Sequence, residues 1–184
     1  MTAPAKVLIP IAHGSESLET VALLNVLRRA ELDVTLASIE PELVINGTRA
    51  VKLVADRRFF DVRDEKFEMI VLPGGEKGAA ALNRHAPLIE RLEMQNDRGK
   101  WLAAICAAPA LVLAAHHLLD RRKATCYPAF KAQLPNWVDQ AVVQDAHVVT
   151  SQGPNTAVAF ALHLVDVLAG AALRKQVATA LLAS

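Results

Sequence analysis

The chain has 184 residues, a length that fits a single domain over residues 1–184 with a sizeable buried core. Hydrophobic residues make up 53% of the chain and charged residues 21%, which excludes an intrinsically disordered protein. The 20 Lys and Arg residues nearly balance the 19 Asp and Glu residues, and the resulting net charge of +1 predicts no sequence-specific nucleic-acid partner and no polybasic membrane surface.

The first half of the chain begins an alternation of strands and helices. The apolar pattern predicts a buried strand over 6–12, a loop over 13–17, a helix over 18–30 with Ser17 as its N-cap, and a strand over 33–38. Residues 43–51 carry Asn-Gly between β-type residues, which is the strongest hairpin signal in the chain.

The second half continues the alternation. The sequence predicts strands over 67–72, 101–105 and 124–126, a hairpin over 142–151, and helices over 86–98, from 107 onward, over 155–168 and up to about 182. This order indicates an α/β fold with a mostly parallel central sheet. Ligands bind such sheets at the carboxyl ends of the strands, where we expect the loops 13–19, 73–77 and 106–109 to lie.

One apolar window has the length of a membrane span. Residues 101–119 contain no Asp, Glu, Lys or Arg. Pro109 in the middle of the window, two histidines and many alanines favour a buried strand followed by a buried helix. We therefore expect no membrane partner.

The two cysteines, Cys106 and Cys126, do not suggest a disulfide framework. There is no CxxC pair and no Cys/His cluster with zinc spacing, so we expect no metal site and a reducing compartment, the cytoplasm. The first residues place one Lys before a short apolar run, and we expect no signal peptide.

Three motifs carry candidate chemistry, each with a structural alternative. Cys106 lies where a strand turns into a helix, a position that favours a thiolate nucleophile, although for the position alone a buried structural cysteine is the commoner explanation. Gly74 and Gly75 either present backbone amides to an oxyanion or form an ordinary turn. Glu16 and Glu19 either stabilise the first turn of a helix or move protons near the thiol.

Together, GSESLETV, VLPGG and AAICAAPALVLA resemble the ThiJ/PfpI superfamily, in the branch of the parkinsonism-linked deglycase and bacterial YajL. NGTR, TCYP and TSQGPNTA extend the resemblance over nearly the whole chain. The resemblance implies a flavodoxin-like three-layer sandwich that forms a homodimer and uses no cofactor.

The resemblance also implies roles for individual residues. It makes Cys106 the nucleophile, Glu19 the acid that holds it, and Glu16 a second carboxylate of the site. Gly75 and Ala107, with Gly74 beside them, would line the site with backbone amides. Arg29 and Arg49 would lie near the dimer-side entrance.

Some relatives place a His directly after the nucleophile or in the TCYP segment, whereas this chain has Ala107 and Cys126-Tyr127 there. Without a Cys–His pair, peptidase or amidotransferase chemistry is not expected. His13 is the nearest candidate in a site-facing loop, and we assign it no chemical role.

The sequence is compatible with two functions. In the first, Cys106 and Glu19 act as a glyoxalase III or deglycase on small α-oxoaldehydes and on glycated proteins or nucleotides. In the second, Cys106 is a non-enzymatic redox sensor or thiol chaperone.

Overall fold

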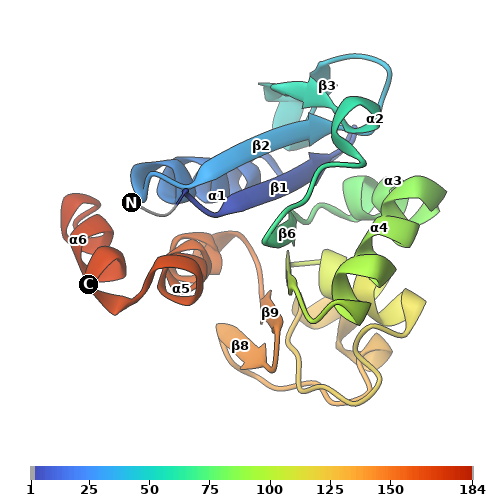
Figure 1. The fold of residues 1–184 in the computed structure, drawn as a ribbon. Coiled ribbons are helices and arrows are strands. Elements are labelled where there is room, and N and C mark those ends of the chain that lie inside the picture. Colours follow the sequence, from blue (N-terminus) through green and yellow to red (C-terminus); the bar gives the residue numbers. More distant parts are fainter. Residues whose placement is uncertain (1–2, 184) are drawn as a thin grey trace.

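A seven-stranded sheet forms the centre of the protein, and the computed structural model describes residues 3–183 (Figure 1). The strands follow the order β5-β2-β1-β6-β7-β9-β8, and every neighbouring pair is parallel except β8 and β9. Their bounds are β1 Lys6–Ile11, β2 Asp33–Ser38, β5 Arg57–Arg58, β6 Met69–Leu72, β7 Trp101–Ile105, β8 Val142–Asp145 and β9 Val148–Ser151. The predicted flavodoxin-like α/β architecture is thus confirmed.

Continuous apolar runs produce the central strands. Every residue of β6 and β9 is buried, as are all but the first residue of β1 and β7. Strands covered on both faces need such runs, because neither set of alternating side chains reaches water. The strand order reverses direction at β1, so the carboxyl ends of β1 and β6 border the crevice where ligands bind in open α/β sheets.

Helices flank the sheet (Figure 1). They are α1 Ser17–Arg29, α2 Phe59–Val62, α3 Glu76–Arg84, α4 Ala86–Asp97, α5 Ala157–Ala169 and α6 Ala171–Ala180. Short 3₁₀ segments lie at Thr48–Ala50, Ala114–His116, Pro128–Gln133 and Pro154–Thr156, and a π-helical turn lies at Pro109–Leu113. Helix α1 packs against α5, and α5 packs against α6.

The Asn-Gly signal correctly predicted a hairpin. Strands β3 (Val44–Asn46) and β4 (Lys52–Val54) pair antiparallel outside the main sheet. The connection is longer than a two-residue turn, because residues 47–51 fold through a 3₁₀ segment closed by Gly47 N–H donating to Val51 C=O at 2.9 Å.

Several local predictions were wrong. The N-cap of α1 is Glu16, whose carboxylate accepts the N–H of Glu19 at 2.7 Å, and Ser17 is the first helical residue. The segment expected as a loop over 73–77 already contains the start of α3, and the strand expected over 124–126 is a single bridge from Ala124 to Trp137.

The apolar window 101–119 is divided by the fold. It comprises strand β7, a turn at 106–107, the π-helical turn and the following 3₁₀ segment, rather than a strand followed by a regular helix. Across residues 3–183, no helix combines the length and apolarity that a membrane crossing requires.

Candidate active site

Glu19, Gly74 and Cys106 meet at the carboxyl edge of the sheet. Glu19 lies in the first turn of α1, Gly74 follows β6, and Cys106 follows β7. The Gly74 N–H donates to Glu19 Oε2 at 2.8 Å. A Cβ added at Gly74 would lie 2.5 Å from the Cβ of Cys106 and 2.7 Å from Glu19 Oε2. Only glycine therefore leaves room for the thiol and the carboxyl group to stand side by side.

Cys106 is held in a strained backbone conformation. Its φ of 64° lies in the left-handed region, which costs a non-glycine residue about 1–3 kcal/mol. Its N–H donates to the carbonyl of Ser151 at 3.0 Å, and its carbonyl accepts the N–H of Tyr127 at 2.8 Å. These two bonds hold the turn from both sides. Cys106 keeps 9% of its surface exposed, whereas Cys126 has none exposed.

Glu19 is a buried carboxyl group beside the thiol. It is fully buried, and its side chain interacts with Cys106. Within residues 3–183, its Oε1 atom has no hydrogen-bond partner. Burial, helped by the charge of Glu16, raises the pKa of Glu19 from 4.5 to about 7, against the lowering effects of the Gly74 amide and Cys106. A group with this pKa exchanges protons readily near neutral pH.

The expected lowering of the Cys106 pKa was wrong. Burial, and next the negative charge of Glu19, raise the pKa of the thiol from 9.0 to about 12. The amides of Gly75 and Ala107 face the sulfur and lower the pKa, but they do not offset burial and the carboxylate. The position of Cys106 at a strand end predicted only the effect of the backbone amides on its pKa. Burial and the neighbouring charge depend on the tertiary structure and could not be read from the sequence. At neutral pH the pair therefore holds a thiol beside a carboxyl group that can take its proton.

Gly75 and Ala107 are thus brought together with Cys106, as the resemblance implied. Gly75 has a φ of 83°, and a Cβ there would collide with the backbone of Gly14 and Glu16. The N–H of Glu16 donates to the carbonyl of Gly74 at 2.9 Å. The loop after β1 and the loop after β6 are therefore fastened together by backbone contacts that side chains would prevent.

The Glu16 carboxylate connects the start of α1 to the β3–β4 hairpin. One of its carboxylate oxygens accepts the Glu19 N–H, and the other accepts the Thr48 hydroxyl at 3.0 Å. Thr48 also accepts the Ser17 N–H at 3.1 Å, so the β3–β4 hairpin is fastened to the start of α1. Sequence reasoning missed this contribution of Thr48. The NGTR motif was the available signal, but the hairpin's position could not be read from it.

Neither of the two arginines expected near a dimer-side entrance hydrogen-bonds to Cys106 or Glu19 in the described part of the chain. Arg29 is ten residues after Glu19 on α1, about 15 Å along the helix axis, and its Nε donates to Asn25. Arg49 is exposed in the hairpin connection. His13 accepts the Asn46 N–H through Nδ1 at 3.0 Å, which orients the hairpin.

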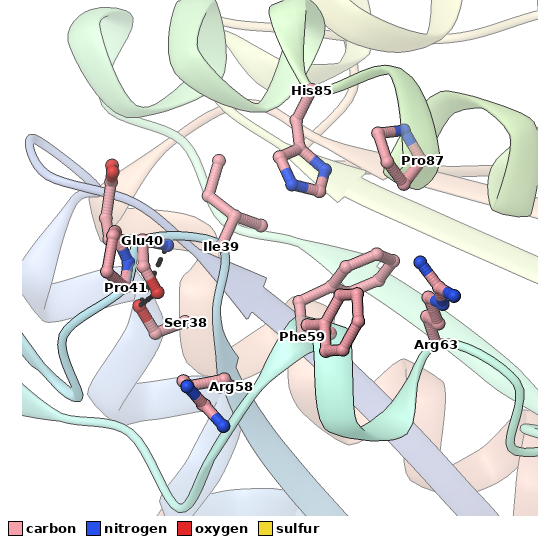
Figure 2. Close-up of a pocket in the computed structure, with 10 residues that line it drawn as sticks. Ser38, Ile39, Glu40, Pro41, Arg58, Phe59, Arg63, His85 and Pro87 are labelled. Carbon is pink, nitrogen blue, oxygen red and sulfur yellow. Dashed lines mark hydrogen bonds between the residues drawn. The ribbon is translucent and has the colours of Figure 1, made fainter.

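A separate pocket of about 260 Å³ does not include Cys106. Figure 2 shows its lining, which includes His85, Phe59, Arg58 and Arg63. The rings of His85 and Phe59 pack edge to face, with their centroids 5.3 Å apart. The lining holds no cysteine, and its Ser38 hydroxyl donates to the carbonyl of Glu40 rather than to His85, so the pocket shows no nucleophile bonded to a base. We therefore place the chemistry at Cys106. Among the residues that the structure describes, no group of three His, Cys, Asp or Glu side chains could hold a metal ion.

Comparison with known proteins gives consistent relatives. Residues 5–167 match the DJ-1/PfpI family. Protein DJ-1 homolog A of Arabidopsis thaliana is 42% identical over 180 residues, which is 96% of this chain and 46% of that protein. The chain thus spans less than half the length of this relative. Glutathione-independent glyoxalase DJR-1.2 of Caenorhabditis elegans is 34% identical over 172 residues, 90% of this chain and 89% of that protein.

Among solved structures, oxidized DJ-1 of Toxoplasma gondii superposes with a TM-score of 0.95 at 39% identity, over 97% of this chain and 98% of that chain. This agreement extends over nearly the whole length of both chains.

Proposed function

Because this chain belongs to the DJ-1/PfpI family, we propose that it is a cofactor-independent enzyme acting on small α-oxoaldehydes, of the glyoxalase III or deglycase type. One observation carries the proposal: Cys106, held in a strained conformation with 9% of its surface exposed, stands against a buried carboxyl group whose pKa is near 7, with two backbone amides facing the sulfur. The relative from C. elegans that is named a glutathione-independent glyoxalase supports the same activity.

The first step forms a bond from sulfur to carbon. As Cys106 Sγ attacks the aldehyde carbon of methylglyoxal, ionised Glu19 takes the thiol proton. The carbonyl oxygen becomes an alkoxide beside the sulfur, where the amides of Gly75 and Ala107 stabilise its charge. Protonation of that oxygen gives a hemithioacetal.

The second step moves a proton between carbons. Glu19 removes the hydrogen from the former aldehyde carbon and returns a proton to the neighbouring carbon, so the first carbon is oxidised and the second is reduced. The product is a lactoyl thioester on Cys106. Water then attacks its carbonyl, the carbon–sulfur bond breaks, and lactate leaves as the thiol regains its proton. Early amine adducts of the aldehyde would enter the same sequence with loss of the amine.

Substitution of the nucleophile tests this proposal. Cys106→Ser should abolish methylglyoxal turnover, measured as lactate formation in an amine-free buffer, because a hydroxyl group is a far weaker nucleophile than a thiol. His13→Ala is the control and should retain turnover, since His13 contacts only the hairpin. Lactate formation at the same rate by Cys106→Ser would show that the activity is not that of this site.

A second candidate is a redox sensor, favoured by the existence of an oxidized form of the Toxoplasma relative. Peroxide would transfer one oxygen to Cys106 to give a sulfenic acid and a second to give a sulfinic acid, with water formed each time. Protonated Glu19 would donate a hydrogen bond to the product. Stoichiometric oxidation without lactate formation by the unmodified protein would favour this function.

The active form is proposed to be a homodimer built on α1. Leu18 and Val21 on this helix are 56% and 50% exposed although both are large and apolar. Apolar side chains that share an exposed helix face are typical of subunit contacts. In such a dimer, Arg29 would reach the entrance of the partner's site rather than that of its own chain.

A further inference from the structure

Positive charge gathers at the edge of the sheet opposite Cys106. A cleft of about 760 Å³ lies at the amino ends of β1, β6 and β7, beside one face of α4. Its charged lining consists of five cations and one carboxylate: Lys6, Lys66, Arg91, Arg98, Lys100 and Glu68. Residues 3–5 and Phe67 supply the apolar part of the lining.

Three of these cations lack a counter-charge. Lys100 Nζ lies 2.7 Å from both oxygens of Glu68, so the single carboxylate of the cleft is already engaged. Across residues 3–183, no carboxylate lies within 4.0 Å of Lys66, Arg91 or Arg98. The cleft therefore concentrates positive charge that no ion pair of the described residues neutralises.

Arg91 is a buried cation of this cleft, and burying a charge without an ion pair costs free energy. Only 7% of the residue is exposed, its Nη2 donates to the carbonyl of Glu65 at 2.6 Å, and its Nε has no hydrogen-bond partner within the described part of the chain. Burial and then the charge of Arg98 lower the pKa of Arg91, with Asp64 opposing them. A buried guanidinium group normally requires an anion or several acceptors.

The cations on α4 share one face. Arg91, Gln95 and Arg98 are spaced i, i+4 and i+7, and Gln95 Nε2 donates to the carbonyls of Phe67 and Glu68 at 3.2 and 3.3 Å. These bonds fix the helix face against the start of β6. A cation at a helix C-terminus also stabilises the helix dipole, which explains Arg98 but neither the buried Arg91 nor Lys66.

We propose that this cleft binds a small polyphosphate anion of the size of a nucleoside triphosphate. Its volume lies in the range of small-molecule sites, about 300–1,000 Å³. Arg91 and Arg98 are separated by seven residues, about 10 Å along the helix axis, so a chain of phosphates spans them better than a single phosphate. Guanidinium groups bind phosphate oxygens in pairs, and two of them, Arg91 and Arg98, line the cleft. The proposal is independent of the chemistry at Cys106.

Calorimetric titration of the full chain with ATP, inorganic triphosphate and inorganic phosphate, without added metal, tests the proposal. We expect saturable binding of both triphosphates and much weaker binding of inorganic phosphate. Tighter binding of ATP than of inorganic triphosphate would show that the nucleoside contributes, and equal binding would assign the site to the phosphate chain. Absence of saturable triphosphate binding at millimolar concentration would overturn the proposal.

Two exposed cations can be removed without touching a buried group. The double variant Lys66→Gln/Arg98→Gln should weaken triphosphate binding about tenfold, from a few-fold for each exposed cation. The matched control Lys52→Gln/Arg121→Gln removes the same charge from exposed positions outside the cleft and should leave the affinity within about twofold. Equal weakening in both double variants would show only a general charge effect and would overturn the site.

A spectroscopic readout locates the anion. The Nε–H resonance of Arg91, identified by its loss in Arg91→Lys, should shift on addition of inorganic triphosphate. Triphosphate should cause the same shift in Cys106→Ser, because the two sites lie at opposite edges of the sheet. Binding without any change in this resonance would contradict the location. If Arg91→Lys does not fold, the two double variants still decide the proposal.

Discussion

Glu19→Gln should lower the activity of the protein and, above about pH 4.5, raise its stability relative to the unmodified protein. The variant keeps the shape of the side chain and an oxygen to accept the Gly74 N–H, but it removes the ionisable proton. In the unmodified protein, folding raises the pKa of Glu19 from 4.5 to about 7. Since one pKa unit is worth about 1.4 kcal/mol, the carboxyl group opposes folding by about 3 kcal/mol once it is ionised in both states.

The sign of the effect follows from proton binding. Below pH 4.5 the carboxyl group is protonated in both folded and unfolded chains, so it imposes no cost of ionisation. Between pH 4.5 and about pH 7 the unfolded chain has lost the proton and the folded chain still holds it, so the free energy of unfolding falls as the pH rises. Glu19→Gln lacks this decline. Its stability relative to the unmodified protein should therefore rise by about 3 kcal/mol from pH 4 to pH 8.

Urea denaturation at a series of pH values measures this difference. Glu93→Gln is the control, because it removes a carboxyl group from an exposed position of α4 and should give a curve parallel to that of the unmodified protein. Methylglyoxal turnover by Glu19→Gln should fall by about 10²–10⁴-fold, the usual contribution of a general acid–base group. A stability difference that stays constant from pH 4 to pH 8 would refute the burial argument for Glu19.

Three further predictions concern the site and the proposed dimer. Turnover by the unmodified protein should rise with pH through about 7, as Glu19 ionises and becomes able to take the thiol proton, and a profile that is flat across this range would contradict the role of Glu19 as base. Gly74→Ala should lose turnover and about 1–3 kcal/mol of stability in urea denaturation, because its Cβ would overlap Cys106 and Glu19. The control Gly99→Ala, with no atom within 4 Å of the new Cβ, should keep turnover and should cost about 1 kcal/mol through its positive φ. Light scattering should give twice the 19.8 kDa mass of the chain, and Leu18→Glu/Val21→Glu should give the monomer; a monomeric unmodified protein would contradict the proposed dimer.

The sequence by itself determined the order of the main elements. Apolar runs at 6–12, 67–72 and 101–105 predicted the central strands because strands covered on both faces need uninterrupted hydrophobic side chains. Local signals also predicted the hairpin at 43–51 and the helices around 18–30 and 86–98. The short α2 and α3 were missed, since four and nine residues carry too little periodicity to stand out.

Motifs also identified Glu19, Gly75 and Cys106 as residues of one site, but only the tertiary structure decided their chemistry. Sequence position suggested a thiolate favoured by backbone amides, whereas the folded chain buries the thiol beside a carboxylate and raises its pKa to about 12. A pKa depends on the solvent and the charges around a group. The groups around Glu19 include Gly74 and Cys106, which lie 55 and 87 residues after it in the chain. The contact of Thr48 with Glu16 and the unpaired charge of Arg91 likewise arise from long-range packing, which no local pattern encodes.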